Sequence, residues 1–192
     1  MKKILCGALV LLILAGIVLA QIVSPNGKEE KTLKILVVYY SHSGNTREIA
    51  NMLKDLTGGD IFEIQTTAPY PAEYNAIVKQ VKKEKNSGIK PQIKNGFAGS
   101  QNYDLVFLGS PCWFGTIATP VETFLSRQDF SGKTIVPFVT SGGSGLGSIE
   151  RDISVLQPSA NVAPGRAFNR SSVKSTQKEI ADWLASSLRQ AR

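Results

Sequence analysis

The chain alternates five times between short apolar runs and longer segments that carry apolar residues at helical spacing. The first run, residues 33–40, is interrupted only by Lys34 and is rich in Ile and Val, which is typical of a strand buried on both faces of a parallel sheet. Further strands are predicted at residues 60–65, 103–109, 134–140 and 161–168. Amphipathic helices are predicted at residues 47–56, 72–85 and 175–188. Two further helices are predicted, one that starts at Pro120 and carries Val121, Phe124 and Leu125, and one that carries Ile149, Ile153 and Leu156. This alternation predicts an α/β domain with a parallel sheet between two layers of helices.

Two positions modify this pattern. Thr119, Pro120 and Glu122 have the order of a capping box, so Thr119 is predicted to cap the helix that follows it. Pro137 lies inside the fourth predicted strand, where it lacks the N–H that a central strand donates. We expect a strand there nevertheless, with a local irregularity.

A polar loop, Ser41-His42-Ser43-Gly44-Asn45-Thr46, joins the first strand directly to the first helix. Its backbone N–H groups and the free amides of the first helical turn point the same way, which favours a dianion such as phosphate. The loop contains no Lys, so it does not resemble a Walker A motif. The alternative is an ordinary helix start with Asn45 or Thr46 as the N-cap.

The loop sequence Ser-x-Ser-Gly-Asn-Thr resembles the loop with which flavodoxins bind the phosphate of FMN, with Ser43 where the family usually has Thr. Two further loops, GSPCWFGT after the third strand and TSGGSG after the fourth, follow in the order that the family has. The resemblance covers residues from about 33 to 190. It implies a three-layer, doubly wound, five-stranded parallel sheet of order 2-1-3-4-5, as is known for flavodoxin, with FMN where the order reverses.

The resemblance also implies which residues surround the cofactor. Trp113 would stack on the isoalloxazine ring, and Gly115 would let a peptide carbonyl turn toward the flavin N5–H. Backbone amides of the third loop would face the pyrimidine edge of the flavin. The expected cofactor-binding residues are Ser41, His42, Ser43, Gly44, Asn45, Thr46, Pro111, Cys112, Trp113, Phe114, Gly115, Thr116, Ser141, Gly142 and Gly143. The chain departs from well-known members in its basic charge and in having no aromatic residue in the third loop.

Neither His42 nor Cys112 is predicted to act as a catalyst or metal ligand. His42 is the only histidine and has no carboxylate or thiolate near it in sequence, so we interpret it as a neighbour of the phosphate. Cys112 has no charged residue beside it, which favours a small apolar filler over a redox-active thiol.

The composition is that of a globular protein, with 42% hydrophobic and 19% charged residues among 192. The formal net charge is +7, or +5 without Lys2 and Lys3 (7 − 2 = 5). Basic residues do not alternate with aromatic ones, so we expect no nucleic-acid partner. The lysines at 79, 82, 83 and 85 fall on one predicted helix, which indicates a solvated face or else a docking patch for an acidic partner.

Residues 1–20 are interpreted as a signal peptide or an N-terminal membrane anchor. Lys2 and Lys3 precede an apolar stretch from Ile4 to Ala20, so membrane contact is expected through residues 4–20. Both alternatives place the domain outside the cytoplasm, because the lysines stay inside. Residues 21–32 are predicted to be a linker and residues 33–192 the FMN-binding domain.

From these features we predict an FMN-binding electron-transfer protein that exchanges electrons with a redox partner protein or a small electron acceptor. The alternative on the same fold is an FMN-dependent NAD(P)H or quinone oxidoreductase, which an uncovered flavin face favours. A third alternative is a domain that binds a phosphate ligand and has lost the flavin.

Overall fold

The computed structural model describes residues 32–94 and 96–190. A compact unit begins at Leu33 and extends to the C-terminus. The predicted leader, residues 1–20, and nearly all of the predicted linker lie outside the described residues. Within the described ranges, no helix combines the length and the apolar character that crossing a membrane requires.

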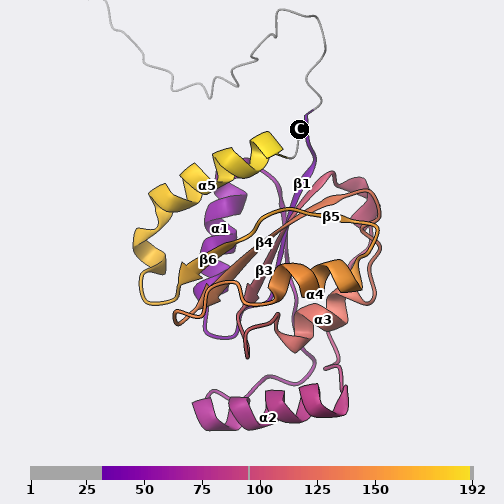
Figure 1. The fold of residues 1–192 in the computed structure, drawn as a ribbon, viewed down its shortest axis with the longest axis vertical. Helices are drawn as coiled ribbons and strands as arrows, with labels where there is room; N and C mark the ends of the chain where they lie inside the picture. The colour runs from indigo at the N-terminus through magenta and orange to yellow at the C-terminus, as the bar shows by residue number, and fades with distance from the viewer. Residues whose placement is uncertain (1–31, 95, 191–192) are drawn as a thin grey trace, which may run out of the picture. The chain divides into compact units, whose positions relative to one another are not determined.

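The sheet is parallel throughout, with β1 (Ile35–Tyr39) between β2 (Asp60–Glu63) and β3 (Leu105–Pro111). On the other side of β3 lies β4 (Thr134–Ser141), which pairs with β5 (Asn161–Val162). The order is β2-β1-β3-β4-β5, which confirms the predicted order and the doubly wound fold (Figure 1). The order reverses between β1 and β3, so the loops after these strands meet at one end of the sheet.

The single fifth strand predicted over residues 161–168 is wrong, because two short strands replace it. After β5, β6 (Arg166–Asn169) also pairs with β4, starting opposite Phe138. The break lies beside Pro137, which has no N–H to offer a partner strand. There Gly165 passes so close that a Cβ on it would lie 2.7 Å from the Pro137 carbonyl oxygen. The predicted irregularity at Pro137 therefore affects only the side of β4 that pairs with β5 and β6, while β4 keeps its register with β3.

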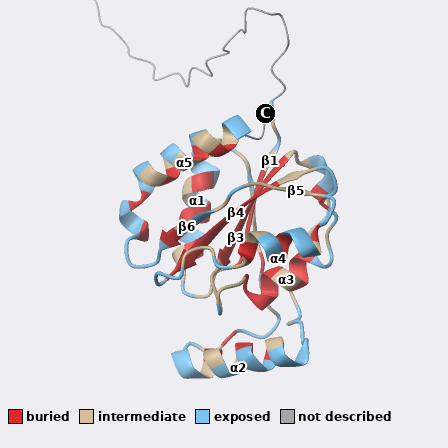
Figure 2. Cartoon of the chain, viewed as in Figure 1, coloured by how far each residue is buried: buried red, intermediate tan, exposed pale blue. Residues whose placement is uncertain are grey.

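Helices cover both faces of the sheet (Figures 1 and 2). One face is covered by α1 (Asn45–Thr57) and α5 (Gln177–Gln190), whose apolar side chains pack on strand residues such as Val37 and Phe107. The other face is covered by α3 (Thr119–Leu125) and α4 (Ile149–Leu156), which pack on neighbours such as Leu36 and Val106. Strand residues alternate between the faces, so near-continuous apolar runs are required, as the sequence predicted.

The helix α2 (Tyr74–Ser87) lies on the side of α3 but is set apart from the sheet (Figure 1). Half of its residues are exposed, and only Ile77, Val81 and Glu84 are buried (Figure 2). This placement leaves a cleft between α2 and the loops that follow the strands. The chain also contains two short 3-10 turns, Ser100–Asn102 before β3 and Val173–Ser175 before α5.

The predicted capping box at α3 is wrong. The N-cap is Ala118, while Thr119 is the first helical residue and its hydroxyl donates to a carboxylate oxygen of Glu84 at 2.6 Å. Glu122 does not reach back to the helix start, because it pairs with Lys85 at 3.1 Å. The Thr119 hydroxyl therefore bonds to the buried Glu84 side chain and does not cap the backbone N–H groups of α3.

Candidate functional site: a cleft at the carboxyl ends of the strands

The loop after β1 presents unpaired amides toward the end of the sheet. Gly44 is the N-cap of α1 with φ 93°, which excludes Asn45 and Thr46 from that role. The first intrahelical hydrogen bond runs from the Glu48 N–H to the Gly44 carbonyl, so the amides between them have no acceptor within the helix. The buried Thr46 hydroxyl lies 2.8 Å from that of Thr140, which ties this loop to β4.

Ser41 supplies a second indication of a ligand at this loop. Its hydroxyl oxygen is buried and has no hydrogen-bond partner among the described residues. A buried hydroxyl without a partner costs about 1–3 kcal/mol, which an acceptor or donor on a bound ligand would offset. With the free amides of α1, this oxygen fits a phosphate group.

The loop after β3 forms a two-residue turn at Phe114 and Gly115. Trp113 and Thr116 exchange backbone hydrogen bonds of 3.0 and 3.1 Å across it. Both central residues have positive φ, 54° at Phe114 and 76° at Gly115, as a type I′ turn requires. Such a φ is unusual for Phe, and its side chain is 55% exposed. The turn therefore keeps an aromatic ring and a strained peptide at the surface of the cleft.

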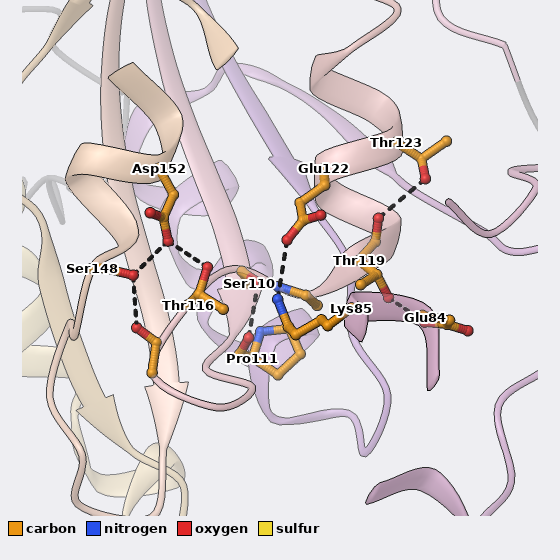
Figure 3. Close-up of polar contacts among 12 residues, drawn as sticks. Glu84, Lys85, Ser110, Pro111, Thr116, Thr119, Glu122, Thr123, Ser148 and Asp152 are labelled. Carbon is orange, nitrogen blue, oxygen red and sulfur yellow. Dashed lines mark hydrogen bonds and ion pairs between the residues drawn. The ribbon is translucent and has the colours of Figure 1, made fainter. Parts of the chain in front are cut away.

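The turn is anchored to α4 through Asp152 (Figure 3). One carboxylate oxygen of Asp152 accepts hydrogen bonds from the Thr116 hydroxyl and from the Ser148 hydroxyl. Ser148 also donates its N–H to the Gly115 carbonyl at 2.7 Å. The Thr116 side chain is thus bound to Asp152 and does not line the cleft.

Trp113 is held by other rings and faces the cleft. Its ring centroid lies 5.0 Å from that of Tyr70, 5.7 Å from that of Tyr40 and 6.2 Å from that of His42. Burial raises the pKa of the Tyr70 phenol, and it lowers the pKa of the His42 imidazole. Tyr40 and Tyr70 hold the indole through edge-on and tilted contacts, and Trp113 also lines the cleft, where its ring is available to a flat ligand.

Behind this aromatic group lies a buried carboxylate. Glu84 accepts a hydrogen bond from the Tyr70 hydroxyl at 2.7 Å. It accepts another from the Thr119 hydroxyl, which Figure 3 shows. Gln80 donates to its second oxygen at 2.9 Å. The buried charge is thereby compensated by hydrogen bonds, and it joins α2 to α3 and to the tyrosine that supports Trp113.

The cleft has a volume of about 750 Å³, within the range of small-molecule and cofactor sites. The predicted residues that line it are His42, Ser43, Asn45, Pro111, Cys112, Trp113, Phe114, Gly115, Ser141 and Gly142. The predicted Ser41, Gly44, Thr46, Thr116 and Gly143 do not line it, although Ser41, Gly44 and Thr46 shape the loop beneath it. Sequence reasoning missed Ala72, Tyr74, Ile77, Val78, Val81, Thr140, Ser144 and Arg170.

The missed residues come from α2 and the segment just before it, from the end of β4 and the loop after it, and from the segment after β6. Helical spacing in α2 indicated only a core-facing stripe, and nothing in the sequence placed that stripe beside the loops. Cys112 is a free thiol that accepts a weak hydrogen bond from the Ser144 hydroxyl at 3.5 Å. Among the described residues, no group of three potential ligands could hold a metal ion.

Comparisons with known proteins agree with this fold and site. The family model described as Flavodoxin matches residues 34–187. A candidate flavoprotein from Bacteroides eggerthii is 31% identical, with TM-score 0.65, over 78% of this chain and 98% of its own. One from Bacteroides uniformis is 30% identical, with TM-score 0.67, over 77% and 99%.

A flavoprotein from Lactobacillus acidophilus, solved in complex with FMN, is 25% identical, with TM-score 0.60, over 74% of this chain and 97% of its own. None of the curated proteins matches the chain. The family match covers the whole compact unit apart from its ends, including the loops that line the cleft. The chain therefore belongs to the flavodoxin family.

Proposed function

We propose that this chain binds FMN in the cleft and carries electrons between redox partners. The FMN complex of the Lactobacillus acidophilus relative supports the choice of ligand. The unpaired Ser41 hydroxyl and the free amides at the start of α1 suit the phosphate, and the Trp113 face suits the isoalloxazine ring. When bound, FMN supplies the redox chemistry, and the chain controls its orientation, access and potential.

The observation that carries the electron-carrier proposal is the peptide between Phe114 and Gly115. Neither its carbonyl nor its N–H makes a hydrogen bond within the described part of the chain, although the groups around it do. Trp113 and Thr116 bond to each other, and the Gly115 carbonyl is bound by Ser148. The turn thus offers one unpaired peptide at the cleft, where the family resemblance expects a carbonyl acceptor for the flavin N5–H. Such an acceptor favours transfer of single electrons.

A second candidate function is an FMN-dependent oxidoreductase with a small organic substrate. The apolar α2 wall of the cleft favours it, with Ile77, Val78 and Val81 inside and Tyr74, 70% exposed, at the rim. An exposed aromatic rim beside an apolar wall would accommodate a flat acceptor such as a quinone. The third loop adds no aromatic ring that would cover the flavin from that side.

Absorbance and reductive titration of the purified protein test these functions. We expect a flavin spectrum, release of FMN on denaturation, and an organic radical signal in electron paramagnetic resonance at half reduction. Rapid reduction by NAD(P)H with no radical at any stage would favour the oxidoreductase. Absence of flavin, together with failure to take up added FMN, would leave a phosphate-binding domain that has lost the cofactor.

We also propose that residues 1–20 direct the domain across the cytoplasmic membrane, as a cleaved signal or as an anchor. Two lysines before the apolar stretch from Ile4 to Ala20 support this proposal. Cell fractionation and N-terminal sequencing test it: a mature chain that starts at Gln21 would establish cleavage. Full-length protein confined to the cytosol would contradict export.

A further inference from the structure

Arg170 lies where the third loop meets the start of α1. It follows β6 directly, and its backbone N–H donates to the Ser141 carbonyl at 2.9 Å. The guanidinium lies along Gly142: a Cβ on that glycine would be 3.4 Å from Arg170 Nε and 3.6 Å from Nη2. The absent side chain at Gly142 thus leaves room for the arginine at the edge of the cleft.

Two hollows share Arg170. One is the cleft described above, and the other has a volume of about 330 Å³ and lies between α1 and the turn after β6. Asn45 lines both as well. Since Asn45 is the first residue of α1 and belongs to the predicted phosphate loop, Arg170 lies beside the place where that loop exposes its amides.

Within the part of the chain that the structure describes, no carboxylate forms an ion pair with the guanidinium of Arg170. Its side chain is exposed. The described lining of the cleft contains no Asp or Glu, and Arg170 is its only formally charged residue. Glu48 is the one carboxylate in the neighbouring hollow, and Lys174 is a second cation there. Guanidinium groups suit phosphate because their N–H donors pair with two oxygens at once.

We propose that Arg170 binds the phosphate of FMN, adding a cation from the end of β6 to a loop that contains none. The assignment rests on the proposed FMN function. The phosphate would lie on the amides of α1 with the Arg170 guanidinium at its open side. The Ser41–Thr46 loop has no Lys or Arg of its own, so the chain supplies the counter-charge from a segment more than a hundred residues away.

Paired titrations with FMN and riboflavin, followed by flavin fluorescence, test this assignment, because riboflavin lacks only the phosphate. We expect Arg170→Gln to weaken FMN binding by roughly tenfold to a hundredfold and riboflavin binding by less than about twofold. Arg170→Lys should retain part of the FMN affinity, and added salt should weaken FMN binding to the native chain more than to Arg170→Gln. Lys174→Gln is the matched control, since it removes a cation from the hollow without touching the cleft.

Three results would overturn the assignment. Unchanged FMN affinity in Arg170→Gln would exclude a contact with the phosphate. Equal losses for FMN and riboflavin would place the arginine at the ring or the ribityl chain instead. Native protein that binds neither flavin would contradict the proposed function itself, and the assignment with it. Thermal melts of Arg170→Gln that match the native protein would exclude misfolding as the cause of a loss.

Discussion

Ser148 donates its N–H to the carbonyl oxygen of Gly115 at 2.7 Å, and its hydroxyl oxygen, which donates to Asp152, lies 3.2 Å from the same carbonyl oxygen. The two residues lie 33 positions apart, one in the turn after β3 and the other at the N-cap of α4. Their contact joins the turn after β3 to the start of α4. The position of the Phe114–Gly115 peptide is therefore set by α4 as well as by its own turn.

Gly147→Ala should disrupt this contact. A Cβ on Gly147 would lie 2.1 Å from the Gly115 carbonyl oxygen, so the turn or the helix start must shift. Gly145→Ala is a matched control, because Gly145 has a similar φ of +64° and no atom within 4 Å of its ideal Cβ. We expect Gly147→Ala to lose about 1–3 kcal/mol more free energy of unfolding than the control, measured by urea denaturation. Equal losses of unfolding free energy in the two variants would show that the contact between Gly147 and the Gly115 carbonyl can relax without cost.

Gly115→Val should reduce the radical signal at half reduction. Gly115 has φ 76°, a conformation that a β-branched residue resists by about 1 kcal/mol or more, although the space around it is open. The substitution therefore changes the turn without creating a clash. Gly132→Val is the control, with φ 71° and open space, outside the cleft lining. An undiminished signal in electron paramagnetic resonance would contradict a role of the Phe114–Gly115 turn in single-electron transfer.

Ser43→Asp should abolish FMN binding while sparing riboflavin. Ser43 is exposed in the loop at the start of α1 and lines the cleft, so a carboxylate there would face the phosphate dianion. Repulsion between the new carboxylate and the phosphate should weaken FMN binding by roughly a hundredfold or more. Ser43→Ala removes the hydroxyl without adding charge and should keep most of the affinity. Unchanged FMN affinity in fluorescence titration of Ser43→Asp would contradict the phosphate assignment.

His42 should make the folded state less stable in acid. Burial lowers its pKa from the ordinary value of 6.5, because the ring packs among aromatic residues and its charged form loses hydration. The unfolded chain then binds more protons, so stability falls as the pH drops through 6.5 toward the lower pKa of the folded state. Proton NMR can follow the only histidine of the chain directly. We expect His42→Gln to lose less stability over that interval, and an identical pH profile would contradict this origin.

The local pattern was sufficient for the positions of the helices and of the first four strands, and for the polar loop that joins β1 to α1. Buried parallel strands require near-continuous apolar runs, and the alternation with amphipathic segments implied a doubly wound sheet. The resemblance of Ser41–Thr46 to a phosphate loop then located one end of the cleft, because a strand, a tight polar loop and a helix are contiguous in sequence. These predictions depended on interactions between near neighbours along the chain.

Long-range packing decided the rest. The Thr119 hydroxyl bonds to Glu84 of another helix, and Gly165, between β5 and β6, passes close to Pro137 of β4. Neither the lost cap nor the split strand could therefore be predicted from local propensity. The α2 wall, the support of Gly115 by Ser148 and the place of Arg170 likewise depend on which segments the sheet order brings together. A periodic pattern states which side of a helix is apolar, but only the tertiary structure states what that side faces.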